Sequence, residues 1–432
     1  MGKKCDLSDY DSGKVMASLV TALVQVGTGT SMAFSGITLP QLTNPKTHDL
    51  FLNQSQTALF GSLGYLGAAI GSFVSGTLLV KLGQRATLLV TLPISLVSWL
   101  ILAVSPTVWH LLSCRTFLGI TMGIMLTASS LYTIEIAHKN IRGILTGILS
   151  LARLLGFLIV TALGVSKLDW RQMGFVLSGV SAVPFFCLFF LPNSPRWLVT
   201  QGRLSEAQKA LVFFRGKHYD CEPELLDITQ QINNVSRKTN NCYQQARLLF
   251  ETETINIFLL MTFLTFLLSM TGCYALLTYL VPIFQAAEAN LDPFISAIIF
   301  CIVRVFGTLV HLCVVDRLGR KPLILISYCL CSLCMAIYGM YFYIHETGIT
   351  SGMGWIPITA TMIFIFFIGV GQPAFSILCG ELLPTSCRSV GNSIFVLVLM
   401  TGTFIASYTY PMTIEALGQH GTFWVLVVCV EQ

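Results

Sequence analysis

The chain has 432 residues, of which 54% are hydrophobic and 10% are charged, and its formal net charge is +5. Its mean hydropathy of +0.75 implies more apolar surface than a soluble domain can bury, which excludes a soluble globular protein. The sequence shows no metal-ligand cluster, nucleophile triad or phosphate-binding loop. We therefore expect neither an enzyme nor a bound metal or cofactor.

Long apolar segments recur along the whole chain. A transmembrane helix needs about 20 mainly apolar residues, and such segments are expected at 15–37, 57–80, 86–105, 109–132, 143–165, 171–191, 256–284, 293–315, 322–344, 355–379 and 389–413. A twelfth begins near residue 420 and is expected to be truncated at Gln432. The sequence therefore predicts an all-α membrane protein.

One long polar stretch, 192–255, divides these segments into two sets. Its charged residues follow patterns compatible with short amphipathic helices. We therefore expect an N-terminal six-span half at 1–191, a cytoplasmic helical connector at 192–255 and a C-terminal half with spans seven to twelve at 256–432.

The basic residues predict the orientation of the chain in the membrane. If the N-terminus is cytoplasmic, the external loops contain only Lys46, Lys167 and Arg171, and nearly all other Lys and Arg lie in cytoplasmic segments. The positive-inside rule favours this arrangement. The cytoplasmic loops then account for the net charge, so no nucleic-acid partner is expected. The sequon that begins at Asn53 falls in the first external loop and predicts glycosylation there.

Charged turns recur in the two halves. The turn Asp316-Arg317-Leu318-Gly319-Arg320-Lys321 has a weaker echo in Lys81-Leu82-Gly83-Gln84-Arg85, and the pair Glu135 and Arg142 has the same spacing as Glu381 and Arg388. Opposite charges at these helix ends can form an ion-pair cluster that breaks when the cytoplasmic side opens, or they can simply anchor the helix ends. The expected cytoplasmic gate consists of Arg85, Glu135, Arg142, Asp316, Arg317, Arg320, Glu381 and Arg388.

These sets of residues, in this order, resemble the sugar porters of the major facilitator superfamily, and in particular the insect facilitated trehalose transporters. The turn at 316–321 resembles the family's loop between spans eight and nine. Further matches are Arg115, Gly119, Tyr132, Glu135, Arg142 and Gly143 in span four, the segment 192–198, and Pro373, Glu381, Pro384 and Arg388 in span ten. The resemblance implies twelve spans in two halves, with a central cavity that opens alternately to each side of the plasma membrane.

The positions that bind sugar in the family differ here. The family's paired glutamines of span seven correspond to Leu268 and Ser269, its following asparagine to Tyr274, a glutamine of span five to Ser150, and the tryptophan of span ten to Ser376. In the first charged turn, Val80 and Gln84 stand where the family has an acidic residue and an arginine. Most of the family's sugar-binding hydrogen bonds therefore cannot be assigned to this chain.

Two arginines, Arg153 in span five and Arg304 in span eight, are expected near the middle of the membrane. Each costs roughly 2.5–3.5 kcal/mol on insertion scales, and no acidic residue in any span lies at that depth. Three explanations remain open. Helix carbonyls satisfy both groups, or the groups donate to a polyhydroxyl solute, or they bind an anionic solute.

The candidate substrate cavity combines these arginines with polar and aromatic residues of the same spans. Thr308 lies one turn from Arg304 on the same helix face, and Tyr279 and Phe375 can stack on sugar rings, although most aromatic residues of such a chain serve packing. The full set is Ser150, Arg153, Ser269, Tyr274, Tyr279, Arg304, Thr308, Phe375 and Ser376.

The resemblance implies a facilitative, uniport-type transporter of a sugar, with trehalose or a hexose as the expected solute. In proton-coupled relatives the residue matching Arg115 pairs with an acid in span one, but 15–37 contains no Asp or Glu, so coupling by that route is excluded. Two alternatives remain: a transporter of the same fold for an anionic or altered solute, and a non-transporting degenerate paralogue. The expected partners are a small solute and the lipid bilayer.

Overall fold

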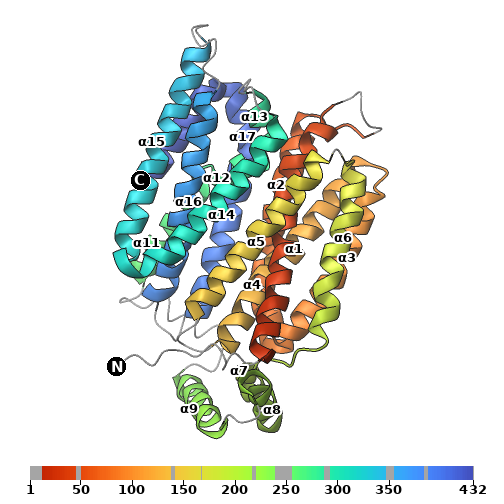
Figure 1. Ribbon diagram of the computed structural model, residues 1–432, viewed down its shortest axis with the longest axis vertical. Helices are drawn as coiled ribbons and strands as arrows, with labels where there is room; N and C mark the ends of the chain where they lie inside the picture. The colour runs from red at the N-terminus through yellow and green to blue at the C-terminus, as the bar shows by residue number, and fades with distance from the viewer. Residues whose placement is uncertain are drawn as a thin grey trace.

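The computed structural model is built from helices (Figure 1). It describes residues 12–44, 50–137, 142–166, 168–216, 220–238, 255–286, 292–346, 355–383 and 388–431, and no strand occurs within these ranges. The helices are α1 (Ser12–Leu42), α2 (Gln54–Leu82), α3 (Gln84–Ala103), α4 (Val108–Ile136), α5 (Arg142–Val165), α6 (Trp170–Leu188), α7 (Pro195–Thr200), α8 (Leu204–Arg215), α9 (Glu222–Lys238), α11 (Ile255–Met270), α12 (Cys273–Thr278), α13 (Leu280–Ala286), α14 (Pro293–Leu318), α15 (Arg320–Glu346), α16 (Trp355–Leu382) and α17 (Arg388–Glu431).

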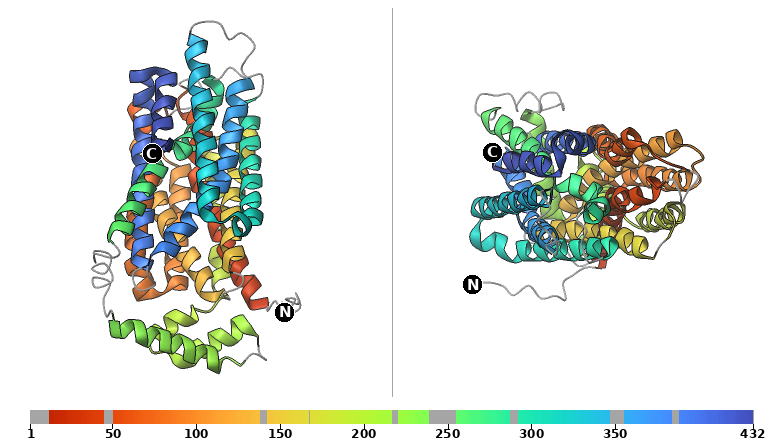
Figure 2. Two further views of the ribbon diagram at one scale, coloured as in Figure 1. Left: turned by 90° about the vertical axis from the view of Figure 1, so that its left-hand side faces the viewer. Right: turned by 90° about the horizontal axis from the view of Figure 1, so that it is seen from above.

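The long helices form two bundles that lie side by side (Figure 1; Figure 2). In the first bundle α2 packs on α4, α1 on α5, and α3 on both α4 and α6. In the second bundle α16 packs on α14 and α15, and α17 on α11 and α15. The two bundles meet along α2 with α17 and along α5 with α14. A solute held between the bundles would therefore contact side chains from both.

The prediction of many membrane-spanning helices is confirmed. By length and composition, 11 helices of the described chain can cross a membrane. The last of them, 390–424, continues past the expected end of the eleventh span and is interrupted at Gly418, where φ is 71°. The expected twelfth span begins after this kink, and its truncation stays a prediction.

The seventh span differs from its prediction. The sequence favoured one helix over 256–284, whereas the structure divides this region into α11, α12 and α13. Gly272 has a φ of 79°, in the left-handed region that favours glycine, and it ends α11. The apolar pattern could not show this break because the residues on both sides of it are buried.

Glycines let the helices of the first bundle approach closely. A Cβ atom at Gly67 or Gly71 of α2 would collide with the backbone oxygens of Thr116 and Ile120 on α4. Small residues at this spacing are typical of tightly packed membrane helices. The contact makes α2 and α4 a single rigid wall of the first bundle.

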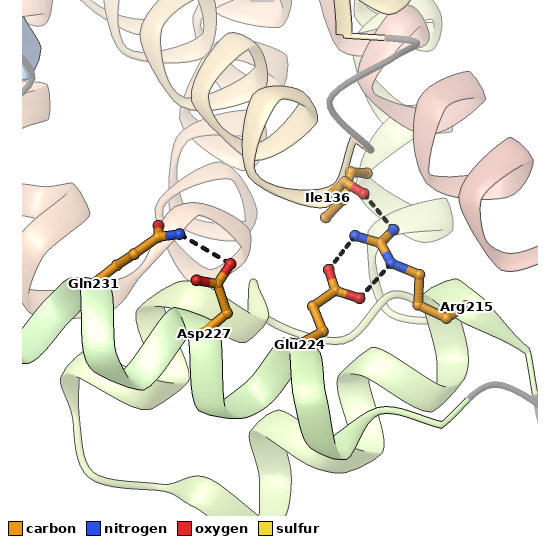
Figure 3. Close-up of polar contacts among 5 residues, drawn as sticks. All are labelled: Ile136, Arg215, Glu224, Asp227 and Gln231. Carbon is orange, nitrogen blue, oxygen red and sulfur yellow. Dashed lines mark hydrogen bonds and ion pairs between the residues drawn. The ribbon is translucent and has the colours of Figure 1, made fainter.

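The helices of the polar stretch, α7, α8 and α9, lie together beyond one end of the bundles, which we call the connector end (Figure 1). Arg215 of α8 donates from Nε and Nη2 to the Glu224 carboxylate of α9, over 3.0 and 2.7 Å, and from Nη1 to the Ile136 carbonyl of α4 over 2.9 Å (Figure 3). Cys221 lies beside this clamp, and burial, together with nearby Glu224, raises the pKa of its thiol. The clamp therefore fixes the connector to the first bundle.

Candidate functional site

A polar network joins three helices of the second bundle. Arg304 of α14 donates from Nη2 to Oε1 of Gln372 on α16 over 3.1 Å. The Nε2 group of Gln372 donates in turn to the hydroxyl of Tyr274 on α12 over 2.6 Å. Because the turn at Gly272 sets the direction in which α12 leaves α11, it also sets the position of Tyr274.

The network continues to the first bundle through aromatic side chains. The ring of Tyr274 lies 6.0 Å from that of Tyr65 on α2, with an interplanar angle of 63°. The hydroxyl of Tyr65 lies 3.2 Å from Oγ1 of Thr278, which is also on α12. Edge-to-face ring contacts and a buried hydrogen bond thus connect α2 with α12 across the seam between the bundles.

Arg153 of α5 faces this network from the first bundle. Its charge interacts with Tyr274 and with Arg304. The Cζ atom of Arg304 lies 5.9 Å from the ring centroid of Phe157, which is one turn from Arg153 on α5. Arg153 and Arg304, which we call the arginine pair, therefore approach each other from opposite bundles.

The arginine pair has unused donors. Within the described residues no carboxylate pairs with either side chain, and Arg153 Nε and Arg304 Nη1 are buried without a hydrogen-bond partner. The one hydrogen bond of the pair goes to an amide side chain rather than to a helix carbonyl. The structure thus gives no support to the explanation that helix carbonyls satisfy both groups.

The hydroxyls of Ser150, Thr308 and Ser376 donate to carbonyls of their own helices, as the Ser269 hydroxyl also does to the Phe266 carbonyl over 2.6 Å. The hydroxyl of Thr308 donates to the Arg304 carbonyl over 3.0 Å, that of Ser376 to the Gln372 carbonyl over 3.2 Å, and that of Ser150 to the Thr146 carbonyl over 3.4 Å. Each such hydroxyl keeps its two lone pairs for another donor. Thr308 and Ser376 lie one turn from members of the network, and Ser150 lies one turn from Arg153.

The remaining predicted cavity residues serve contacts between helices. Ser269 lies against Gly402 of α17, where a Cβ atom would collide with its hydroxyl. Tyr279 donates to the Ser407 carbonyl over 3.0 Å and stacks on Tyr410 at 5.0 Å. Phe375 lies in an apolar cluster with residues of α11 and α17. The structure brings Arg153, Tyr274 and Arg304 together. It places Ser269, Tyr279 and Phe375 outside that group.

Sequence reasoning missed three members of the site: Gln372, Tyr65 and Phe157. A signal was available for Gln372, which is an amide within an apolar span between Gly371 and Pro373. Polar side chains in membrane spans usually face the protein interior and find a partner there. Tyr65 and Phe157 carried no comparable signal, because aromatic residues are frequent throughout the spans.

Arg115 of α4 is a separate buried cation, with 2% of its surface exposed. It donates from Nη1 to the Ser31 carbonyl and from Nη2 to the Ser35 hydroxyl, each over 2.7 Å. Both partners are neutral groups of α1, and the absence of acidic residues from 15–37 agrees with this. The guanidinium therefore ties α4 to α1 without a proton-binding carboxylate.

At the connector end, Glu135 of α4 accepts hydrogen bonds from neutral donors. Nε2 of Gln84 donates to its Oε2 over 2.8 Å, and the Ser194 hydroxyl donates to the same oxygen. Gln84 stands where the resembled family has an arginine, so the contact of this position with Glu135 is a neutral hydrogen bond. Arg85 donates instead to the Leu188 and Phe189 carbonyls at the end of α6, each over 3.1 Å.

The two charged turns have nearly the same backbone conformation. Gly83 has φ 79° and ψ 167°, and Gly319 has φ 80° and ψ 165°. Both lie in a region that glycine adopts without strain, and each donates its N–H to the carbonyl four residues earlier. The echo seen in the sequence is therefore an equivalence of structure.

The other predicted gate residues are only partly described. Arg317 is exposed and Arg320 is half-buried. Arg142, Asp316, Glu381 and Arg388 lie in helices, but their side chains fall outside the described part of the chain. Asn53 precedes α2 and is exposed, and its N–H donates to Gln56 Oε1 over 3.1 Å. Its glycosylation stays a prediction.

Comparisons with known proteins give relatives along nearly the whole chain. It is 31% identical over 418 residues to the facilitated trehalose transporter Tret1 of Bombyx mori, covering 95% of this chain and 81% of the relative. It is 30% identical over 416 residues to the protein of the same name from Drosophila mojavensis, covering 95% of this chain and 48% of the relative. The chain thus spans about half the length of the latter relative.

Solved structures match the fold. The xylose transporter XylE from E. coli, in a partially occluded inward-open conformation, superposes with a TM-score of 0.81 at 19% identity, over 97% of this chain and 96% of XylE. The major facilitator superfamily proton:xylose symporter XylE bound to 6-bromo-6-deoxy-D-glucose gives a TM-score of 0.80 at 20% identity, over 98% and 94%. These likenesses confirm the predicted all-α major facilitator fold.

The family model described as sugar (and other) transporter matches residues 13–431. This match confirms the resemblance drawn from the charged turns and the span-four and span-ten motifs, and it places the chain among transporters rather than enzymes. The chain belongs to the sugar transporter family.

Proposed function

We propose that the chain is a facilitative transporter that moves a sugar across the membrane by alternating access of its two bundles. The observation that carries this proposal is the network from Arg304 through Gln372 to Tyr274, which meets Tyr65 where the bundles join. A few convergent donors and acceptors beside aromatic rings suit a sugar, whose ring presents hydroxyls at its edge and C–H groups on its faces.

The names of the relatives and the partners of Arg115 support the finer part of the proposal. Relatives at about 30% identity are facilitated trehalose transporters, so trehalose or a hexose is the solute that we propose. Arg115 binds the Ser31 carbonyl and the Ser35 hydroxyl. Because neither group gains or loses a proton near neutral pH, we propose uniport driven by the solute gradient alone.

The resemblance to plasma-membrane sugar porters is the support for a plasma-membrane location, and the distribution of basic residues supports a cytoplasmic N-terminus and connector. In this orientation Glu135, Gln84 and Ser194 belong to the gate on the cytoplasmic side. The matching backbone of the turns at Gly83 and Gly319 supports a gate with equivalent parts in the two bundles. We propose that contacts among the gate residues form and break as that side closes and opens.

The proposal is tested by uptake of labelled trehalose and glucose into oocytes that express the chain, with surface biotinylation to count the transporters. Tyr274→Phe removes the hydroxyl that accepts from Gln372, and it should lower uptake at limiting sugar about three- to tenfold. Tyr343→Phe, at an exposed tyrosine of α15, is the matched control and should leave uptake unchanged.

A uniporter also predicts that dissipating the proton or sodium gradient leaves initial uptake unaltered. A strict dependence of uptake on either gradient would overturn the uniport mechanism. Full surface expression without flux of any solute would show that the chain is a non-transporting paralogue.

A further inference from the structure

The arginine pair has few hydrogen-bond partners within the described chain. Arg153 of α5 and Arg304 of α14 approach from different bundles, and their charges interact. Arg304 Nη1 and Arg153 Nε are buried and lack a hydrogen-bond partner. A buried guanidinium usually finds a carboxylate or a full set of acceptors. Neither condition holds for this pair within the described residues.

Arg115 is a buried arginine that joins two helices, and its hydrogen bonds can be compared with those of the arginine pair. Its Nη1 and Nη2 groups both have acceptors on α1 at 2.7 Å, although its Nε is also buried without a hydrogen-bond partner. A ring lies near each of two guanidiniums, Phe60 at 5.8 Å from Arg115 Cζ and Phe157 at 5.9 Å from Arg304 Cζ. The arginine pair differs because Arg304 uses one donor, towards Gln372, and no hydrogen bond from Arg153 is formed within the described chain. Within the described chain each arginine of the pair therefore makes fewer hydrogen bonds than Arg115.

The arginine pair lies at a seam between the two bundles, so its charge affects how that seam closes. α5 and α14 form one of the seams where the bundles meet, so two like charges face each other across a surface that separates and closes in the proposed alternating access. Like charges oppose closure. An anion between them would replace this repulsion with two attractive contacts, one to each bundle.

We propose that Arg153 and Arg304 together bind an anionic group between the bundles, and that this group favours the closed α5–α14 seam. The group is a carboxylate or phosphate attached to the transported sugar, or a free inorganic anion such as phosphate or chloride. The inference rests on the proposed sugar transport and names the chemistry of its solute. Tyr274 and Gln372, beside the pair, are the neutral groups that would contact the hydroxyls of the same solute.

The test measures uptake of labelled D-glucuronate and D-glucose, which differ by a carboxylate in place of a hydroxymethyl group. Uptake is measured in proteoliposomes, in buffers with chloride or phosphate and in one where a bulky organic sulfonate replaces both. The variants are Arg153→Gln and Arg304→Gln, which keep hydrogen-bond donors but remove the charge. Arg203→Gln, in the exposed Arg203–Glu206 pair of the connector, is the control.

A second measurement keeps the test independent of transport. The melting temperature of each purified variant is recorded with and without D-glucuronate, glucose or inorganic phosphate, because a ligand that binds the folded state raises it. A variant that fails to fold is recognised by its melting curve, and the Arg153→Lys and Arg304→Lys variants then replace it, since they keep the charge but lose the planar guanidinium.

Two results support the inference. If glucuronate is taken up in preference to glucose, and either glutamine variant raises its half-saturating concentration about tenfold or more, the anionic group belongs to the sugar. If glucose uptake instead depends on chloride or phosphate, and the variants abolish that dependence, the group is a free anion. In both cases Arg203→Gln behaves as wild type.

Other results overturn it or separate it from the proposed function. The anion site would be refuted if glucose uptake is the same with and without inorganic anions and glucuronate is neither transported nor inhibitory. The proposal of sugar transport would stand in that case. Stabilisation by glucuronate or phosphate that is lost in the glutamine variants, without flux of any sugar, would refute transport while supporting the anion site.

Discussion

Replacing Glu224 with alanine should weaken the clamp, because Arg215 loses its ion-pair partner on α9 and keeps the Ile136 carbonyl of the first bundle. Arg215 makes two hydrogen bonds to Glu224 and one to the Ile136 carbonyl, and the side chains of Arg215 and Glu224 are 6% and 22% exposed. Removing one partner of a buried ion pair costs about 3–5 kcal/mol. Because Glu224 is partly solvated, we expect about 2 kcal/mol, which is roughly a 30-fold increase in the open population.

Limited trypsin digestion measures this opening. Lys209 lies in the middle of α8, and cleavage there requires the helix to open, so its rate follows the open population when closing is fast. Mass spectrometry of the peptide that ends at Lys209 isolates this event from cleavage elsewhere. Glu224→Ala should accelerate it about 30-fold relative to the wild-type chain.

The exposed pair Arg203 and Glu206 provides the matched control. Its side chains are 48% and 46% exposed, and such pairs contribute about 0–1 kcal/mol. Glu206→Ala removes a carboxylate from the same helix as Lys209 and should change the cleavage rate only severalfold. Equal acceleration by both variants, or none with Glu224→Ala, would refute the view that the clamp fixes the connector.

Three further predictions concern other contacts. Arg115→Met should lower the melting temperature by several degrees, because the Ser31 carbonyl loses its charged donor; an unchanged value in a detergent melt would contradict the structure. Gln84→Glu places a carboxylate beside Glu135 and should speed hydrogen exchange in 192–201, whereas Gln84→Met, which only removes the hydrogen bond, should have a smaller effect. Burial raises the pKa of Cys221, so less thiolate exists at pH 7 than for a free thiol, and maleimide labelling should be slow there and accelerate as pH rises. Labelling of Cys221 at pH 7 as fast as that of free glutathione would disprove this.

The spans and the charged turns could be predicted because they depend on local composition. Apolar length alone locates membrane helices, and Gly83 and Gly319 are recognisable by the charges that flank them. The break at Gly272 was not predictable in this way. One glycine among many others in the spans does not show which of them adopts a left-handed conformation, since that depends on how α12 packs against the first bundle.

The candidate site was predicted unevenly for a similar reason. Arg153 and Arg304 are charged residues in apolar spans. The free-energy cost of a charge within the membrane is reason enough to expect a role for them. Serine, threonine and aromatic side chains can form hydrogen bonds within their own helix or pack on a neighbouring helix, as Ser269 packs on Gly402. Their role depends on the direction of the side chain, which the positions of neighbouring helices decide and the sequence pattern does not.

The two matching turns differ in what covers them. A Cβ atom at Gly83 would collide with the Trp197 ring of α7, and Trp197 also donates to the Val80 carbonyl over 3.1 Å, whereas no described atom would lie within 4 Å of a Cβ at Gly319. The Trp197 ring covers the turn of the first bundle, and no such contact is described at the turn of the second. We therefore expect the connector and the first bundle to move as one rigid body, relative to which the second bundle tilts.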